Sequence, residues 1–165
     1  MAKKAATKER FASPAEALFE TCVRVEHMIY VPSLTVDEES YCDTFCEEFV
    51  EGLPERKDAP IYRQLPKLKR FAEADEGPEP WMVADVLRGL PGFIVQAAAP
   101  CRSYLKDGSN GWTWSWGNYW TEWLYAPTEA DIATRCVEWA EWRAEQDRAA
   151  SLKAEKSSPP LHGEG

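Results

Sequence analysis

The stretch from Gly111 to Pro127, GWTWSWGNYWTEWLYAP, constrains the fold of this chain more than any other, because it holds five of the eight tryptophans. A buried tryptophan removes on the order of 150–250 Å² of surface from water, so this much indole must either fill a core or form a binding surface. Aromatic residues also favour strands. The stretch therefore predicts β-structure with at least one aromatic side.

Read as one strand, this stretch would divide its aromatic residues between two faces, because Trp120 and Trp123 differ in parity. A two-residue turn at Gly117-Asn118 would remove the conflict, since glycine in the first central position suits a type II′ turn. Trp112 would then pair with Trp123. We therefore expect a Trp-rich hairpin with one aromatic side, and with Trp120 on the other, more polar side.

Capping residues and apolar periodicity predict helices on both sides of this hairpin. A first helix is expected from Pro14 to about Tyr30, because Leu18, Cys22, Val25 and Ile29 recur at steps of four and three. The other expected elements are helices over 36–52, over 66–74 and from Pro80 to Gly89 or Gly92, an extended segment from Phe93 to Leu105, and a long last helix capped by Thr128.

These elements predict an α+β fold with several N-terminal helices, a short antiparallel β-meander rich in tryptophan, and a long C-terminal helix. The length of 165 residues suits one domain. We expect a flexible basic arm at 1–12, a single globular domain at 13–150, and a disordered tail at 151–165, where the apolar pattern has faded.

Acidic residues dominate the charge of the chain. The 28 acidic and 19 basic residues give a formal net charge of -9. Residues 37–51 carry no base and contain the carboxylates Asp37, Glu38, Glu39, Asp43, Glu47, Glu48 and Glu51. Nonspecific attraction to phosphates is therefore disfavoured, and the aromatic stretch lacks the basic groove typical of single-strand binders. We expect no direct contact with nucleic acid.

No motif in the sequence identifies a reaction. The Walker loop, the dinucleotide fingerprint, the GxSxG elbow and the HExxH motif do not occur. The five cysteines lack the close pairs of zinc sites. We expect the cysteines to be buried thiols and His27 to lie at the end of a helix. The alternative is a zinc site built from Cys22, His27, Cys42 and Cys46. We expect no catalytic residue, no metal and no cofactor.

Location and partners are inferred from the same features. No apolar run reaches the length that crosses a bilayer, and the N-terminus lacks the apolar centre of a signal peptide. We therefore expect a cytoplasmic protein with no membrane contact. The sequence does not indicate an oligomeric state.

The sequence favours a non-enzymatic, acidic protein-binding module. One form of such a module is an inhibitor that occupies a basic nucleic-acid-binding groove of its target, in the manner of phage anti-defence proteins and DNA mimics. An exposed part of the aromatic surface would supply the anchor residues of the contact. A small enzyme with a carboxylate site and a structural subunit of a larger assembly are the alternatives. The candidate partner-binding residues are Asp43, Glu47, Glu51, Trp120, Tyr125 and Trp142.

Overall fold

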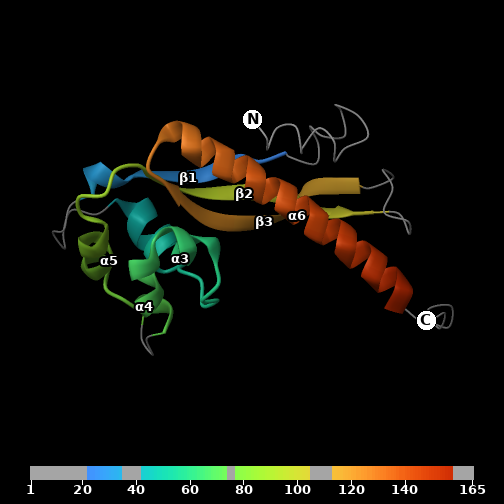
Figure 1. The fold of residues 1–165 in the computed structure, drawn as a ribbon, viewed down its shortest axis with the longest axis horizontal. Coiled ribbons are helices and arrows are strands. Elements are labelled where there is room, and N and C mark those ends of the chain that lie inside the picture. The colour runs from blue at the N-terminus through green and yellow to red at the C-terminus, as the bar shows by residue number, and fades with distance from the viewer. Residues whose placement is uncertain (1–21, 35–41, 74–76, 105–112, 158–165) are drawn as a thin grey trace. The chain divides into compact units, whose positions relative to one another are not determined.

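A computed structural model describes residues 22–34, 42–73, 77–104 and 113–157. The basic arm at 1–12, the start of the first expected helix, Trp112 and the last eight residues of the chain lie outside these ranges. Within them the fold is α+β: a three-stranded antiparallel sheet with strand order β1-β2-β3, several helices, and a long C-terminal helix (Figure 1).

The chain divides into two compact units. Unit 1 comprises residues 1–24, 98–120 and 137–165, and unit 2 comprises residues 25–97 and 121–136. Strands β2 (Phe93–Ser103) and β3 (Thr113–Ala126) and helix α6 (Glu129–Ser157) each contribute residues to both units.

The first strand, β1 (Arg24–Tyr30), replaces the second half of a predicted helix, which is therefore wrong over these residues. Val25 and Ile29 are four positions apart, and an even spacing places two residues on the same face of a strand as well as of a helix. The β-branched and aromatic residues of this segment favour the strand. Ile29 is 3% exposed and faces the core of unit 2.

The predicted hairpin is also wrong, because β3 runs without interruption from Thr113 to Ala126 and passes through Gly117-Asn118. The prediction assumed that the aromatic residues must share one face. They instead divide between units: Trp123 and Tyr125 are buried in unit 2, while Tyr119 and Trp120 of unit 1 are each 39% exposed.

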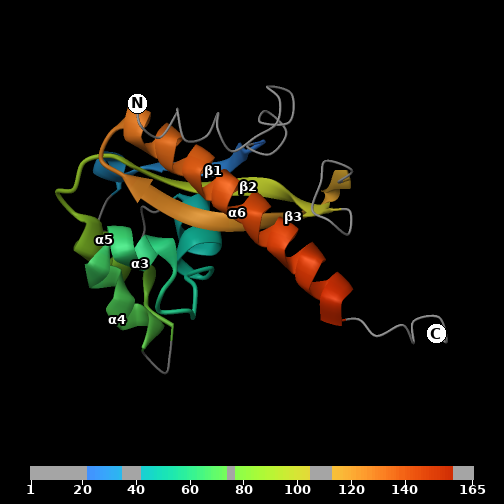
Figure 2. The ribbon, with the colours of Figure 1, turned by 45° about the vertical axis from the view of Figure 1, so that its right-hand side comes forward.

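The short helices of unit 2 lie together on one side of its strands (Figures 1 and 2). They are the π-helix η2 (Thr44–Val50), α3 (Pro60–Gln64), the 3-10 helix η3 (Pro66–Leu68), α4 (Lys69–Ala72) and α5 (Pro80–Leu87), and a single 3-10 turn, η1 (Val31–Ser33), follows β1. Proline begins α3, η3 and α5, as its fixed φ favours. The expected helices at 66–74 and from Pro80 thus correspond to η3 with α4 and to α5.

The core of unit 2 lies between these helices and the sheet. Phe45 and Phe49 of η2 are fully buried, and the Phe49 ring meets Trp123 edge-on at 5.0 Å between centroids. Ile61, Leu68, Val83 and Leu87 from the other helices complete the core with Ile94 of β2. Burial of Phe45 and Phe49 confirms the apolar face predicted for 36–52, although the described part of that helix is a π-helix and shorter.

Helix α6 begins as predicted, since the Thr128 hydroxyl accepts a hydrogen bond from the Asp131 amide at 3.1 Å. It continues to Ser157, beyond residue 150, where the sequence suggested the domain would end. Tyr104 explains the extra length, because its amide donates to Ser151 Oγ at 3.1 Å and its hydroxyl donates to the Ala144 carbonyl at 3.3 Å. These bonds hold the end of β2 against the last turns of α6 in unit 1.

Candidate protein-binding surfaces

Trp120 and Trp142 form an exposed aromatic cluster in unit 1, with Arg143 between them. The two indoles are 39% and 48% exposed. The guanidinium carbon of Arg143 lies 4.0 Å from the Trp120 ring centroid and 4.9 Å from that of Trp142, which is cation–π geometry. The structure thus brings together two of the predicted partner-binding residues, which lie on different elements, β3 and α6.

A buried carboxylate, Asp147, holds this cluster in place. Its Oδ1 accepts a hydrogen bond from Trp120 Nε1 at 3.2 Å, and its Oδ2 accepts one from the Arg102 amide at 3.0 Å. Arg143 lies one helical turn earlier on α6, with Nη2 at 3.8 Å from Oδ1. Burial raises the pKa of Asp147, while the Arg102 amide and the Arg143 charge oppose that shift. Trp120 is therefore fixed at its polar edge while its ring remains accessible.

Three of the predicted partner-binding residues are acidic: Asp43, Glu47 and Glu51. All three lie in unit 2, on or beside η2, and are exposed. The sequence argument placed them on an α-helix, with a regular rise per residue. A π-helix has more residues in each turn, so these carboxylates are not spaced as they would be on an α-helix. What remains is a set of exposed carboxylates on one short element.

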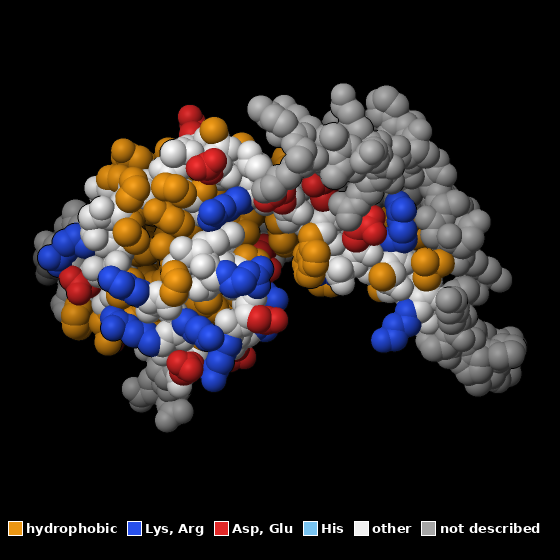
Figure 3. All heavy atoms as spheres, viewed as in Figure 1, with side chains coloured by type: hydrophobic (Ala, Val, Ile, Leu, Met, Phe, Trp, Pro, Cys, Tyr) orange, Lys and Arg blue, Asp and Glu red, His pale blue; other side chains and the backbone are white. Residues whose placement is uncertain are grey.

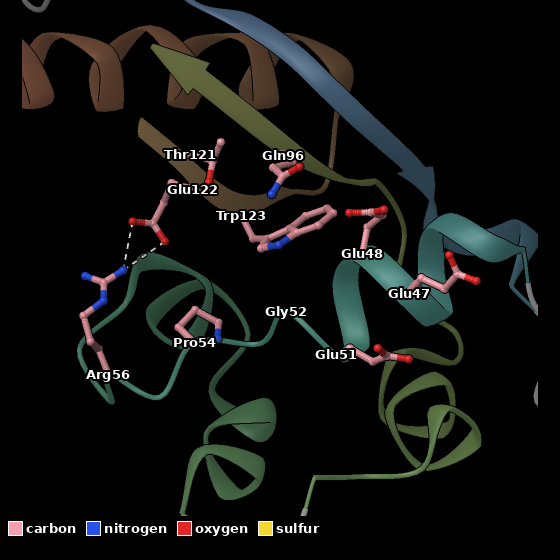
Figure 4. A pocket seen from close by; sticks show the side chains of 10 residues that line it. All are labelled: Glu47, Glu48, Glu51, Gly52, Pro54, Arg56, Gln96, Thr121, Glu122 and Trp123. Carbon is pink, nitrogen blue, oxygen red and sulfur yellow. Dashed lines mark hydrogen bonds and ion pairs between the residues drawn. The ribbon is translucent and has the colours of Figure 1, made fainter. Parts of the chain in front are cut away.

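A cleft of about 370 Å³ opens beside η2, and Figure 4 shows how its residues lie. The Glu48 side chain points toward the indole of Trp123, whereas Glu47 and Glu51 point away from it. On the opposite side, Arg56 Nη2 donates to both oxygens of the buried Glu122 at 3.1 and 3.3 Å. The cleft is therefore acidic on the η2 side, and Arg56 and Glu122 compensate each other on the other.

His27 belongs to the same region and is not at a helix end. Its ring stacks near Trp123 at 6.4 Å between centroids, and its Nε2 lies 3.7 Å from Glu48 Oε2. No local pattern predicts this pairing, because His27 and Trp123 meet only when β1 and β3 enter the same sheet.

Tyr125, the remaining predicted partner-binding residue, is buried in the core of unit 2 and is 7% exposed. Its hydroxyl donates to the Pro91 carbonyl at 2.6 Å, and its amide donates to Gln64 Oε1 at 2.7 Å. Burial raises the pKa of the Tyr125 hydroxyl. Tyr125 therefore has a packing role, and its prediction as a surface contact is wrong. It lies two residues from Trp123 on β3, so both side chains face the same core.

Sequence reasoning missed Arg143, Asp147 and Arg102 as parts of the aromatic cluster. The spacing of Arg143 and Asp147 is a detectable helical pair. Their contacts with Trp120 and with Arg102 depend on how α6 meets β3 and β2, which no local pattern specifies.

In the residues that the structure describes, no group of three or more His, Cys, Asp or Glu side chains is arranged to hold a metal ion. Cys42 is exposed, and Cys136 is 5% exposed. Burial raises the pKa of the Cys136 thiol to about 11. Cys136 is therefore a protonated, inaccessible thiol in the folded chain.

We expect this difference to appear in alkylation. With iodoacetamide at about pH 8, near the usual thiol pKa, Cys42 should be modified rapidly and Cys136 only after unfolding. Peptide mass spectrometry of the native and the denatured chain measures both sites. Rapid native labelling of Cys136 would contradict its burial.

Comparison of the chain with protein-family models, with curated proteins and with solved structures gives no match. Among the described residues, no helix is both long enough and apolar enough to cross a membrane.

Proposed function

We propose that this chain is a cytoplasmic, non-enzymatic protein-binding module, and that Trp120 and Trp142 are anchor residues of its partner contact. The observation that carries the proposal is the exposed stack Trp120–Arg143–Trp142. Tryptophan and arginine are the residue types most enriched among residues that dominate binding energy.

Rigidity of the cluster supports the same function. The bond from Trp120 Nε1 to the buried Asp147 restrains the indole before any partner arrives. Arg143 is held between two rings and one carboxylate. Side chains ordered in advance lose less conformational entropy on association, so more of their contact energy appears as affinity.

Affinity capture from native lysate tests the proposal. The full chain, immobilised through one terminus, should retain one dominant partner at near-stoichiometric amount, identified by mass spectrometry. Absence of a partner, together with turnover of a metabolite in the same lysate, would contradict the proposal and favour a small enzyme with a carboxylate site.

A finer form of the proposal concerns the partner, which we infer to carry a basic groove of the kind that binds nucleic acid, so that the chain acts as an inhibitor. Its support is the set of exposed carboxylates on and beside η2, together with the net charge of -9. Such a surface accelerates association with a basic partner by long-range attraction.

We therefore expect the combined change Asp43→Asn, Glu47→Gln and Glu51→Gln to slow association by about tenfold at low salt and to flatten its salt dependence. These side chains are exposed, so the melting temperature should stay nearly unchanged. Stopped-flow or surface-based kinetics with the captured partner measures the effect. The combined change Asp85→Asn, Glu129→Gln and Asp131→Asn, at exposed positions of α5 and α6, removes the same number of charges and provides a matched control. An unchanged association rate and salt dependence would contradict the proposal, and would mean that these carboxylates only contact solvent.

A further inference from the structure

Unit 2 carries a basic face, although the chain as a whole is acidic. Residues 55–73 contain six basic residues, Arg56, Lys57, Arg63, Lys67, Lys69 and Arg70, against three acidic ones, Glu55, Asp58 and Glu73. Figure 3 shows Lys and Arg side chains gathered over the region where α3 and α4 lie in Figure 1. We define the basic face as Arg63, Lys67, Lys69 and Arg70, all of which are exposed.

The charges of this face are only weakly compensated within the described residues. Glu73 pairs with Lys57 at 3.7 Å, and Arg63 donates to the Asp58 carbonyl at 2.5 Å rather than to a carboxylate. Within the same residues, neither Lys67 nor Lys69 has an ion pair. Local positive charge therefore remains available on a chain whose net charge is negative.

An apolar cleft adjoins the basic face. It has a volume of about 350 Å³, and its lining combines the apolar side chains of Val50, Leu53, Phe71, Ala72 and Pro78 with the carboxylates Glu51 and Glu55. Arg70 connects the two features, because its guanidinium carbon lies 4.9 Å from the centroid of the Phe71 ring. A cleft of this size accepts a large aliphatic or aromatic side chain.

We propose that unit 2 binds an acidic segment of another protein along α3 and α4, with one apolar side chain of that segment inserted into the cleft. Carboxylates of the segment meet Lys67, Lys69 and Arg70, and the apolar side chain meets Phe71 and Leu53. This contact does not use Trp120 or Trp142 and does not depend on the proposal made for them, but its cleft shares Glu51 with the acidic surface on and beside η2.

The surroundings favour a peptide over nucleic acid. A nucleic-acid strand carries a phosphate at every residue, and Glu51, Glu55 and Asp58 would oppose such a continuous charge. A peptide can instead place its acids opposite the lysines and leave neutral residues beside Glu51 and Glu55.

Fluorescence anisotropy with synthetic probes tests the proposal. The probe is a short labelled peptide with Glu and Asp on one side of a Leu and neutral Ser and Gly on the other, so that no acid has to lie beside Glu51 and Glu55. The comparison probes carry Ala in place of Leu, Lys in place of the acids, or single-stranded DNA of equal length. We expect the acidic Leu peptide to bind the full chain. The Ala peptide should bind about tenfold more weakly, and the Lys peptide and the DNA should bind least.

Variants of the chain locate the contact. Lys67→Glu with Lys69→Glu should weaken binding of the acidic Leu peptide by about tenfold, because both cations become repulsive. Arg88→Glu with Lys153→Glu changes the total charge equally but outside the basic face, and it should have little effect. Ala72→Leu should fill the cleft and abolish the preference for Leu over Ala in the peptide. Thermal melts of each variant verify folding.

Each contrary result overturns the proposal. No binding of the acidic Leu peptide means that the face does not take such a segment. Equal or tighter binding of DNA reassigns the face to nucleic acid. An equal loss of affinity in the Arg88 and Lys153 control means that net charge, rather than this face, governs the interaction.

Discussion

Replacing Gly92 by Ala should destabilise the fold by about 4 kcal/mol, because the backbone conformation at this position disfavours a Cβ and there is no space for one. Its φ is 107°, where side chains with a Cβ are strained, and an added Cβ would overlap the Ala126 carbonyl oxygen and lie 2.6 Å from Pro127 Cα. These neighbours are backbone atoms at the end of β3, so no side chain can rotate away. Chemical denaturation measures the loss.

Gly89 provides the matched control for this change. Its φ of 83° is also positive, but an added Cβ would meet no atom within 4 Å. Gly89→Ala should therefore cost only about 1 kcal/mol, from backbone strain alone. Equal losses for the two variants would show that the close approach of Gly92 to β3 is not a constraint, and would contradict the packing of β2 and β3 described here.

The second large effect concerns binding. Trp142→Ala should raise the dissociation rate of the captured partner by about 100-fold, as expected when a residue that dominates binding energy is truncated. Trp142 is 48% exposed, so the change should cost the fold little. Trp120→Ala should act similarly on dissociation, but it also leaves Asp147 Oδ1 without its indole donor. Trp120→Ala should therefore lower stability as well.

Trp81→Ala is the control for these variants, because Trp81 is 40% exposed but belongs to α5 in unit 2. Its loss should leave the dissociation rate within about twofold of the original. If Trp81→Ala and Trp142→Ala raise the rate equally, binding depends on exposed indole in general and not on the Trp120–Arg143–Trp142 stack.

Local chemistry was sufficient to predict several elements from the sequence. Pro80 begins α5 and Thr128 caps α6, because both effects act within one helical turn. Exposure of Trp120 and Trp142 was also expected. The strands were harder, since the step of four from Val25 to Ile29 fits a strand as well as a helix, and the β-branched residues decided the outcome in favour of β1.

The arrangement of the candidate site could not be predicted in the same way. The amide of Arg102 and the indole of Trp120 reach Asp147 from 45 and 27 residues away. Such contacts depend on the packing of α6 against β2 and β3. The hairpin prediction failed for a related reason: it required one aromatic face, whereas β3 supplies Trp123 to a core and Trp120 to a surface.

Hydroxyl-radical footprinting of the full chain, free and bound to its captured partner, tests the central proposal most directly. Oxidation of each tryptophan is read by peptide mass spectrometry, with Trp81 as the internal reference. The proposed function predicts strong protection of Trp120 and Trp142 in the complex and unchanged oxidation of Trp81. Equal oxidation of Trp120 and Trp142 with and without the partner would contradict it.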